Sequence, residues 1–182
     1  MHKDRDLALL EDCKRGDRDA LDSLVRRYER PVFNAAYRML GNSDEAADVT
    51  QTTFLKAFEH LDRFNPEFKF FSWIYRIAVN ESINQLNRRN RLEVLGEDPT
   101  SSLRGPDDMA DSRRLSNAVQ SVLLELTEDH RAVIVLRHFV EISYREIGAI
   151  LQIPEKTVKS RLFSARQQMK DLLQSRGLFG DD

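Results

Sequence analysis

A run of aromatic side chains leads directly into a basic helix between residues 64 and 91. Its first twelve residues hold six of the fifteen aromatic residues in the chain. Trp73, Asn80, Asn84 and Arg88 then recur at helical steps, which places them on one face. Aromatic rings stack on unpaired bases, guanidinium groups hold phosphates, and asparagine amides pair with base edges. The pattern suggests a surface for single-stranded nucleic acid.

A competing interpretation applies to the same stretch. A soluble helical protein can bury an aromatic cluster in its core and leave the basic end of the following helix in water. Taken by itself, the stretch favours this structural interpretation. When the rest of the chain is considered, nucleic-acid binding becomes the favoured interpretation.

A second group of residues, between Ser143 and Lys170, has the pattern of a helix-turn-helix. Ser143 and Glu146 form a capping box that opens a short helix, and Pro154 suits the first position of the next one. Residues 155–170 carry five basic side chains and one acidic one. The second helix of such a motif enters the major groove of DNA. Its exposed face is expected to carry Lys156, Lys159, Ser160 and Phe163, with Arg161 and Arg166 on phosphates. An ordinary helical hairpin with a solvated basic face is the alternative.

Composition limits the classes of function that the chain can have. The chain has 182 residues and a net charge of −2, so its overall charge gives no sign of nucleic acid. The single cysteine, Cys13, and four scattered histidines predict no disulfide, metal site or cofactor and fit the reducing cytoplasm. We find no signal peptide, membrane span, Gly-rich phosphate loop or nucleophile elbow, which argues against membrane insertion and against an enzyme.

Helical periodicity dominates the chain and predicts an all-α protein. Asp17, Ser43 and Thr127 are expected to cap helices, Gly41 to end one, and Pro31 to start or kink a turn. Residues 92–112 hold two prolines, two glycines, six acids and one arginine. This composition predicts a flexible acidic linker between two helical domains, whose charge could also lie against a basic groove when nucleic acid is absent.

The two halves together resemble the extracytoplasmic-function group of bacterial RNA polymerase sigma factors, the smallest members of the housekeeping sigma family. The resemblance covers about residues 5–175 and implies a region 2 domain at 1–91, a linker at 92–112 and a region 4 domain at 113–176. Four motifs carry it, in order: Asp48-Val49-Thr50-Gln51 with Phe54-Leu55-Lys56-Ala57-Phe58, then Trp73-Ile74-Tyr75-Arg76-Ile77-Ala78-Val79-Asn80, then Ser143-Tyr144-Arg145-Glu146-Ile147, then Pro154 and Thr157-Val158-Lys159-Ser160-Arg161-Leu162.

The resemblance implies a role for individual residues. It implies that Phe64 and Asn80 form the pocket for a flipped-out base of the −10 element, and that Trp73, Tyr75 and Arg76 support DNA melting. It also implies that Lys159, Ser160 and Phe163 read the −35 element. Arg161 and Arg166 match residues that contact phosphates. It implies core RNA polymerase and promoter DNA as partners, and a separate anti-sigma factor as regulator. The residues matching the polymerase-binding surface are Asp48, Gln51, Phe54 and Lys56.

Three departures from the family pattern stand out. Ala47 and Thr52 occupy positions that are often acidic in the polymerase-binding helix, so phosphorylation of Thr52 is a hypothesis for restoring the charge. Phe68 and its neighbours make the segment before Trp73 unusually aromatic, and Glu155-Lys156 replaces a small residue and glycine. These differences affect the expected −10 and −35 preferences.

A stand-alone helix-turn-helix regulator is the alternative function. It would leave the stretch from Phe64 to Arg91 without a role, and such regulators usually carry a sensing or phosphoacceptor domain that we do not find in the sequence. A regulator should bind a specific duplex alone, whereas a sigma factor should bind poorly without core polymerase.

Overall fold

Every regular element in the described part of the chain is a helix. The structure is a computed structural model and describes residues 2–94 and 110–177. The first half contains α1 (His2–Lys14), α2 (Arg18–Leu40), α3 (Ser43–Glu59), the 3-10 turn η1 (Leu61–Arg63) and α4 (Phe70–Val94). The second half contains α5 (Ala110–Glu125), α6 (Glu128–Ile134), the π-helical segment η2 (Val135–Phe139), α7 (Tyr144–Leu151) and α8 (Glu155–Ser175). The predicted all-α class is confirmed.

Several helix ends follow directly from local chemistry. The carboxylate of Asp17 accepts hydrogen bonds from the first backbone N–H groups of α2, and the hydroxyl of Thr127 accepts one at the start of α6. Gly41 ends α2 at a φ of 72°, a conformation that costs glycine little. Ser143 and Glu146 form the expected capping box at the start of α7. These four predictions are confirmed.

Other local predictions were wrong. Asn42, and not Ser43, caps α3, because its side-chain oxygen accepts from the backbone N–H groups of Asp44 and Glu45 at 2.9 and 3.0 Å. Pro31 does not start a new helix, because α2 continues from Arg18 to Leu40; the alternative, a kink at Pro31, stays a prediction. Its ring lies on the exposed side, while Tyr28 and Val32 pack in the core.

The predicted linker falls mostly outside the described residues, which exclude 95–109. Its two ends are helical, because α4 continues to Val94 and α5 begins at Ala110. The predicted helix after Thr127 is α-helical only as far as Ile134. It continues as the π-helical segment η2, which ends at Phe139.

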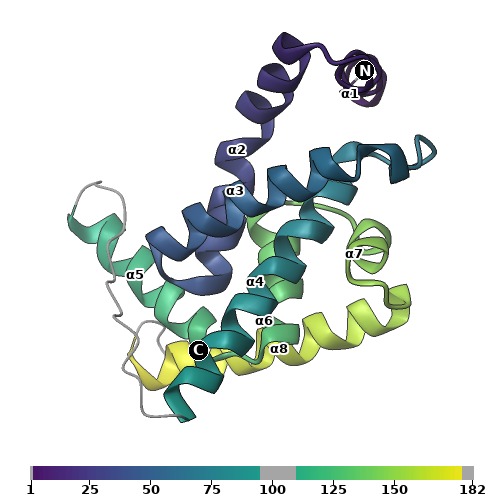
Figure 1. Ribbon diagram of the computed structural model, residues 1–182. Helices are drawn as coiled ribbons and strands as arrows, with labels where there is room; N and C mark the ends of the chain where they lie inside the picture. The colour runs from purple at the N-terminus through teal and green to yellow at the C-terminus, as the bar shows by residue number, and fades with distance from the viewer. Residues whose placement is uncertain (1, 95–109, 178–182) are drawn as a thin grey trace.

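The helices form an N-terminal lobe (α1–α4) and a C-terminal lobe (α5–α8). In the N-terminal lobe α2, α3 and α4 pack against one another, and α1 is held to α2 by the buried Asp6 carboxylate, which accepts from Arg27 and Tyr28. In the C-terminal lobe α8 packs against α5, α6 and α7. The lobes lie side by side, with α7 next to α4 and α5 next to α2 (Figure 1).

Candidate nucleic-acid and partner interfaces

Most of the aromatic cluster belongs to the core of the N-terminal lobe. Phe64, Phe70 and Tyr75 are only 5%, 2% and 2% exposed. The ring of Phe64 contacts Phe70 edge to face and lies 5.3 Å from the ring of Trp73, centroid to centroid. The structural interpretation therefore holds for these three buried rings, and in this arrangement Phe64 and Tyr75 offer no free face to a base.

The polar flank of α4 has the exposure that the nucleic-acid interpretation needs. Asn80, Asn84 and Arg88 are exposed, and Trp73 and Arg76 are half-buried at the start of the same helix. Because they recur at steps of three and four residues, they follow one side of α4. This flank can offer amide groups and a guanidinium to a strand, with the indole edge at its end.

The loop before α4 makes a contact that sequence reasoning did not anticipate. The Nζ of Lys69 lies 2.6 Å from Oε1 of Glu146 at the start of α7. The pKa of Glu146 is lowered, chiefly by this hydrogen bond and less by those from Ser143. Next to Lys69, the side chain of Phe68 is 58% exposed. No local signal pairs Lys69 with Glu146, because 77 residues separate them.

The basic face of α8 is open to solvent. Lys156, Lys159, Ser160 and Phe163 are all exposed, and Phe163 is 74% exposed. Lys159 is held by Glu155 one turn earlier, with Nζ 3.0 Å from Oε1. The buried stripe on the other side of the helix contains Val158, Leu162, Ala165 and Leu173. The helix therefore presents polar and aromatic groups where a major-groove reader carries them.

The two arginines expected on phosphates differ in their surroundings. Arg161 is half-buried and pairs with Asp129 of α6, Nη2 to Oδ2, at 2.8 Å. Arg166 is exposed and its Nε donates to Nε2 of His138 at 3.2 Å. Burial, followed by the charges of Arg166 and Arg137, lowers the pKa of His138, so the neutral imidazole that accepts this bond is favoured. Arg166 is thus the better placed of the two for a phosphate.

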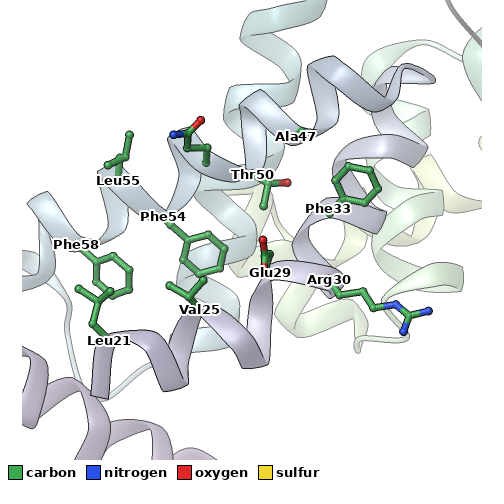
Figure 2. Close-up of a pocket in the computed structure, with 11 residues that line it drawn as sticks. Leu21, Val25, Glu29, Arg30, Phe33, Ala47, Thr50, Phe54, Leu55 and Phe58 are labelled. Atoms are coloured by element: carbon green, nitrogen blue, oxygen red, sulfur yellow. The ribbon is translucent and has the colours of Figure 1, made fainter. Parts of the chain in front are cut away.

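A groove of about 750 Å³ runs between α2 and α3 (Figure 2). Phe54, only 7% exposed, projects from α3 toward Val25 of α2. Leu55 is 57% exposed at its edge. We call this feature the α2–α3 groove; its lining residues are Leu21, Val25, Glu29, Arg30, Phe33, Ala47, Thr50, Gln51, Phe54, Leu55 and Phe58.

The outer face of α3 adjoins this groove. Asp48 and Gln51 are exposed, whereas Lys56 is half-buried and pairs with Glu81 of α4, Nζ to Oε1, at 2.7 Å. Thr52 is half-buried on the same helix. The face combines a carboxylate and an amide with an adjoining apolar surface.

The neighbouring threonines are engaged in the helix itself. The buried hydroxyls of Thr50 and Thr53 each donate to the carbonyl oxygen four residues earlier, at 2.7 Å.

Within residues 2–94 and 110–177, no group of His, Cys, Asp and Glu side chains is arranged to hold a metal ion, and no helix is long and apolar enough to cross a membrane.

Comparison with known families identifies the kind of protein to which these surfaces belong. Residues 24–92 match the family described as Sigma-70 region 2, and residues 116–169 match Sigma-70, region 4. The ECF RNA polymerase sigma factor SigW of Bacillus subtilis is 35% identical over 176 residues, which cover 90% of this chain and 94% of SigW. The chain belongs to the extracytoplasmic-function group of RNA polymerase sigma factors. The RNA polymerase sigma-H factor of Pseudomonas aeruginosa is 32% identical, with 94% and 95% of the two chains covered.

Two solved structures resemble this chain over most of its length. CnrH in complex with the cytosolic domain of CnrY superposes with a TM-score of 0.71 at 28% identity, covering 94% of this chain and 98% of that one. RpoE in complex with the anti-sigma factor NepR from Bartonella quintana gives a TM-score of 0.71 at 25% identity, covering 84% and 96%. Both likenesses extend across the region 2 and region 4 parts of this sigma factor.

Polar contacts join the two lobes of the sigma factor. Gln120 of α5 is buried; its Nε2 donates to the carbonyls of Tyr37 and Arg38 at 3.3 Å, and its Oε1 accepts from Arg38 at 3.0 Å. The guanidinium of Arg38 also lies 4.6 Å from the ring centroid of Phe139. These groups satisfy one another at the end of α2, which stabilises the docked arrangement.

Proposed function

We propose that this sigma factor binds core RNA polymerase, directs it to promoters with −35 and −10 elements, and starts DNA melting. The observation that carries the proposal is the presence, in one chain, of an exposed basic α8 in the region 4 lobe and an exposed polar flank of α4 in the region 2 lobe. The protein performs no covalent chemistry itself, because polymerase supplies the active site. We also propose that the protein acts in the cytoplasm and that it is related to the housekeeping sigma family.

Region 4 reads the −35 element through α8. Lys159, Ser160 and Phe163 face base edges in the major groove, and Lys156 lies at the start of the helix, near base edges or a phosphate. A good bidentate contact contributes about 1–3 kcal/mol of discrimination between bases. Arg166 contacts the phosphate backbone, and Arg161 does so after leaving Asp129.

Region 2 holds the melted −10 strand along α4. Asn80 and Asn84 contact bases, Arg76 and Arg88 contact phosphates, and Trp73 stacks at the end of the flank. Phe64 and Tyr75 contribute from the core of the lobe, because they fix the position of Trp73 and of the loop before α4. An extruded base requires unpairing, which costs a few kcal/mol and is offset by contacts with the protein.

The lobes must separate to reach both elements. The positions that name the −10 and −35 elements differ by about 25 base pairs, which is about 85 Å at roughly 3.4 Å per base pair. A compact chain of this length has a radius of gyration of about 16 Å. We assign residues 1–91 to the region 2 domain, 113–176 to the region 4 domain and 92–112 to the linker that permits the separation.

Core polymerase binds the outer face of α3. Asp48 and Gln51 supply polar contacts, Phe54 supplies apolar surface through the α2–α3 groove, and Lys56 orients Glu81 beside them. An anti-sigma factor that covers this face would block polymerase. The likeness to the sigma factor RpoE, solved in complex with the anti-sigma factor NepR, supports such a partner.

Run-off transcription tests the proposal. Purified core polymerase is incubated with fragmented genomic DNA from the source organism, with and without this protein, and RNA 5′ ends are mapped. We expect starts that depend on the protein and share two spaced upstream elements. Specific duplex binding by the protein alone, without such starts, would instead favour a stand-alone regulator.

Phosphorylation of Thr52 is a regulatory extension of the same surface. Thr52 is the partly accessible residue of the three neighbouring threonines, since Thr50 and Thr53 are buried and hydrogen-bonded. A phosphate would add a charge of about −1.5 to −2 beside Asp48. We expect Thr52→Glu to increase polymerase binding relative to Thr52→Ala. Equal transcription by the two variants would contradict this regulation.

A further inference from the structure

His138 is an exposed titratable residue of region 4 to which the surfaces above assign no role. It lies in η2, a π-helical segment, and π-helical turns often occur at functional sites. Its Nε2 accepts a hydrogen bond from Nε of Arg166 at 3.2 Å. A histidine therefore lies directly beside the arginine that we assign to the phosphate backbone of the −35 element.

Two further side chains join His138 and Arg166. Tyr144, at the start of α7, has its pKa lowered, chiefly by a hydrogen bond from Arg166. The guanidinium of Arg137 lies 5.1 Å from the Tyr144 ring centroid and donates to the carbonyl of Ile142 at 3.0 Å. We call Arg137, His138, Tyr144 and Arg166 the η2–α8 cluster; it gathers donors from three elements on one side of region 4.

The η2–α8 cluster carries positive charge that no carboxylate neutralises. Within residues 2–94 and 110–177, neither Arg137 nor Arg166 forms an ion pair, whereas Arg161 of the same α8 pairs with Asp129. Guanidinium groups without an acidic partner are available to hold a phosphate.

The protonation of His138 responds to this positive charge. Burial, and then the charges of Arg166 and Arg137, lowers its pKa from the ordinary value of 6.5. Tyr144 faces the cluster from α7, and Arg38 of α2 lies against the ring at the end of η2. The imidazole is therefore neutral at neutral pH and uses its lone pair to accept from Arg166. A phosphate against the cluster would have the opposite effect on the pKa, because its negative charge favours the imidazolium.

We propose that protonated His138 binds a backbone phosphate of the −35 element together with Arg166, so that promoter binding takes up a proton. The Nε2–H of the imidazolium donates to one phosphate oxygen, and the guanidinium that no longer donates to His138 donates to another. The inference rests on the proposed function, because it requires that α8 binds the −35 duplex.

The direction of the pH dependence follows from the charge of the phosphate. The pKa of His138 is higher in the complex than in the free protein, so the affinity for DNA rises as pH falls through the interval between the two values. Above and below that interval, His138 has the same protonation state in both forms and contributes no pH dependence.

The test measures the affinity of holoenzyme for a −35 duplex between about pH 6 and about pH 8, the range in which histidine titrates. Holoenzyme is assembled from core polymerase and the full-length protein, and the duplex comes from a promoter found by run-off mapping. The proteins compared are wild type, His138→Gln, His138→Arg and His60→Gln. His60→Gln is the matched control, because it removes an exposed histidine at the end of α3, in the other lobe.

Relative to His138→Gln, wild-type affinity should rise about tenfold from about pH 8 to about pH 6, since a shift of one pKa unit in a linked group changes the affinity tenfold. His138→Arg, which is always charged, should bind more tightly than wild type at the higher pH and lack this rise. His60→Gln should keep the wild-type profile. At the lower pH, the slope of log affinity against log salt should be steeper for wild type than for His138→Gln by about 0.9.

Identical pH profiles for wild type and His138→Gln would overturn the inference and leave the proposed function intact. A loss of affinity in His138→Gln that is the same at every pH would overturn it too, because it would give His138 a purely structural role. If wild-type holoenzyme does not bind the −35 duplex at any pH, the proposed function fails, and this inference fails with it.

Discussion

Arg131 of region 4 donates a hydrogen bond from its guanidinium to the main-chain carbonyl of Met39 in region 2. Its other donors reach carbonyls near the end of α5, namely those of Leu123, Leu124 and Leu126. One buried cation thus satisfies carbonyls at the C-terminal ends of two helices from different lobes, where the helix dipole favours positive charge. Burial, and then the charge of Arg89, lowers the pKa of Arg131 to about 10, which leaves it protonated at neutral pH.

Replacing Arg131 should destabilise the whole protein. In Arg131→Leu the carbonyls at both helix ends lose their donor while much of the site stays closed to water. We expect the free energy of unfolding to fall by about 2–5 kcal/mol, measured by urea denaturation. Arg145→Leu, at an exposed position of α7, should change it by no more than about 0.5 kcal/mol. Equal effects of the two variants would show that the buried guanidinium contributes no special stability.

Gln120 offers a milder way to loosen the lobes. Gln120→Ala removes its hydrogen bonds to Tyr37 and Arg38 but leaves the cores of both lobes intact. We expect small-angle scattering to give a radius of gyration above the value of about 16 Å for a compact chain. Asn117→Ala, at an exposed position of the same helix, should leave the radius unchanged. A compact Gln120→Ala protein with unaltered helix content would mean that apolar contacts alone keep the lobes docked.

Lys159 should contribute charge to promoter binding. Lys159→Ala removes one cation from the exposed face of α8, so the slope of log affinity against log salt should become less steep by about 0.9. The measurement is holoenzyme binding to a −35 duplex at several salt concentrations. Gln167→Ala on the same helix changes no charge and should keep the wild-type slope. An unchanged slope for Lys159→Ala would place that ammonium away from the phosphates.

Tyr75 should make the protein sensitive to alkali. Burial raises the pKa of Tyr75 to about 12, from an ordinary value of 10.0. Because the folded pKa is the higher one, the contribution to stability is present below pH 10 and is lost as pH rises through 12, by up to about 3 kcal/mol. The pKa of Tyr28 shifts in the same direction, through burial and then Asp6.

The test is urea denaturation between about pH 9 and pH 12, followed alongside tyrosinate absorbance. In Tyr75→Phe the fall in stability should be shallower than in wild type but not absent, because Tyr28 still titrates. Identical pH profiles for Tyr75→Phe and wild type would show that Tyr75 ionises without cost in the folded state.

Local sequence chemistry was sufficient for most of the helices. The pairing of Ser143 with Glu146, the cap at Asp17 and the left-handed Gly41 each depend on atoms within a few residues of one another, so the sequence contains all the information needed. Asn42 and Ser43 show where local prediction fails. Both side chains are suitable for an N-cap, and only the backbone geometry determines that Asn42 caps α3.

The exposed face of α8 was also readable in advance. A buried stripe at steps of three and four residues leaves the intervening side chains in water whichever helices cover the stripe. For that reason Lys159 and Phe163 were placed correctly on the outside without any knowledge of the fold.

Only the tertiary structure decided which aromatic rings are available and how the lobes meet. Phe64 and Phe68 have the same kind of side chain in the same segment, yet one is 5% and the other 58% exposed, because burial depends on what the other helices cover. The contacts of Arg131 with Met39 and of Lys69 with Glu146 join residues 92 and 77 positions apart. No sequence pattern encodes such pairs locally, since they form only when separate helices pack and bring their ends together.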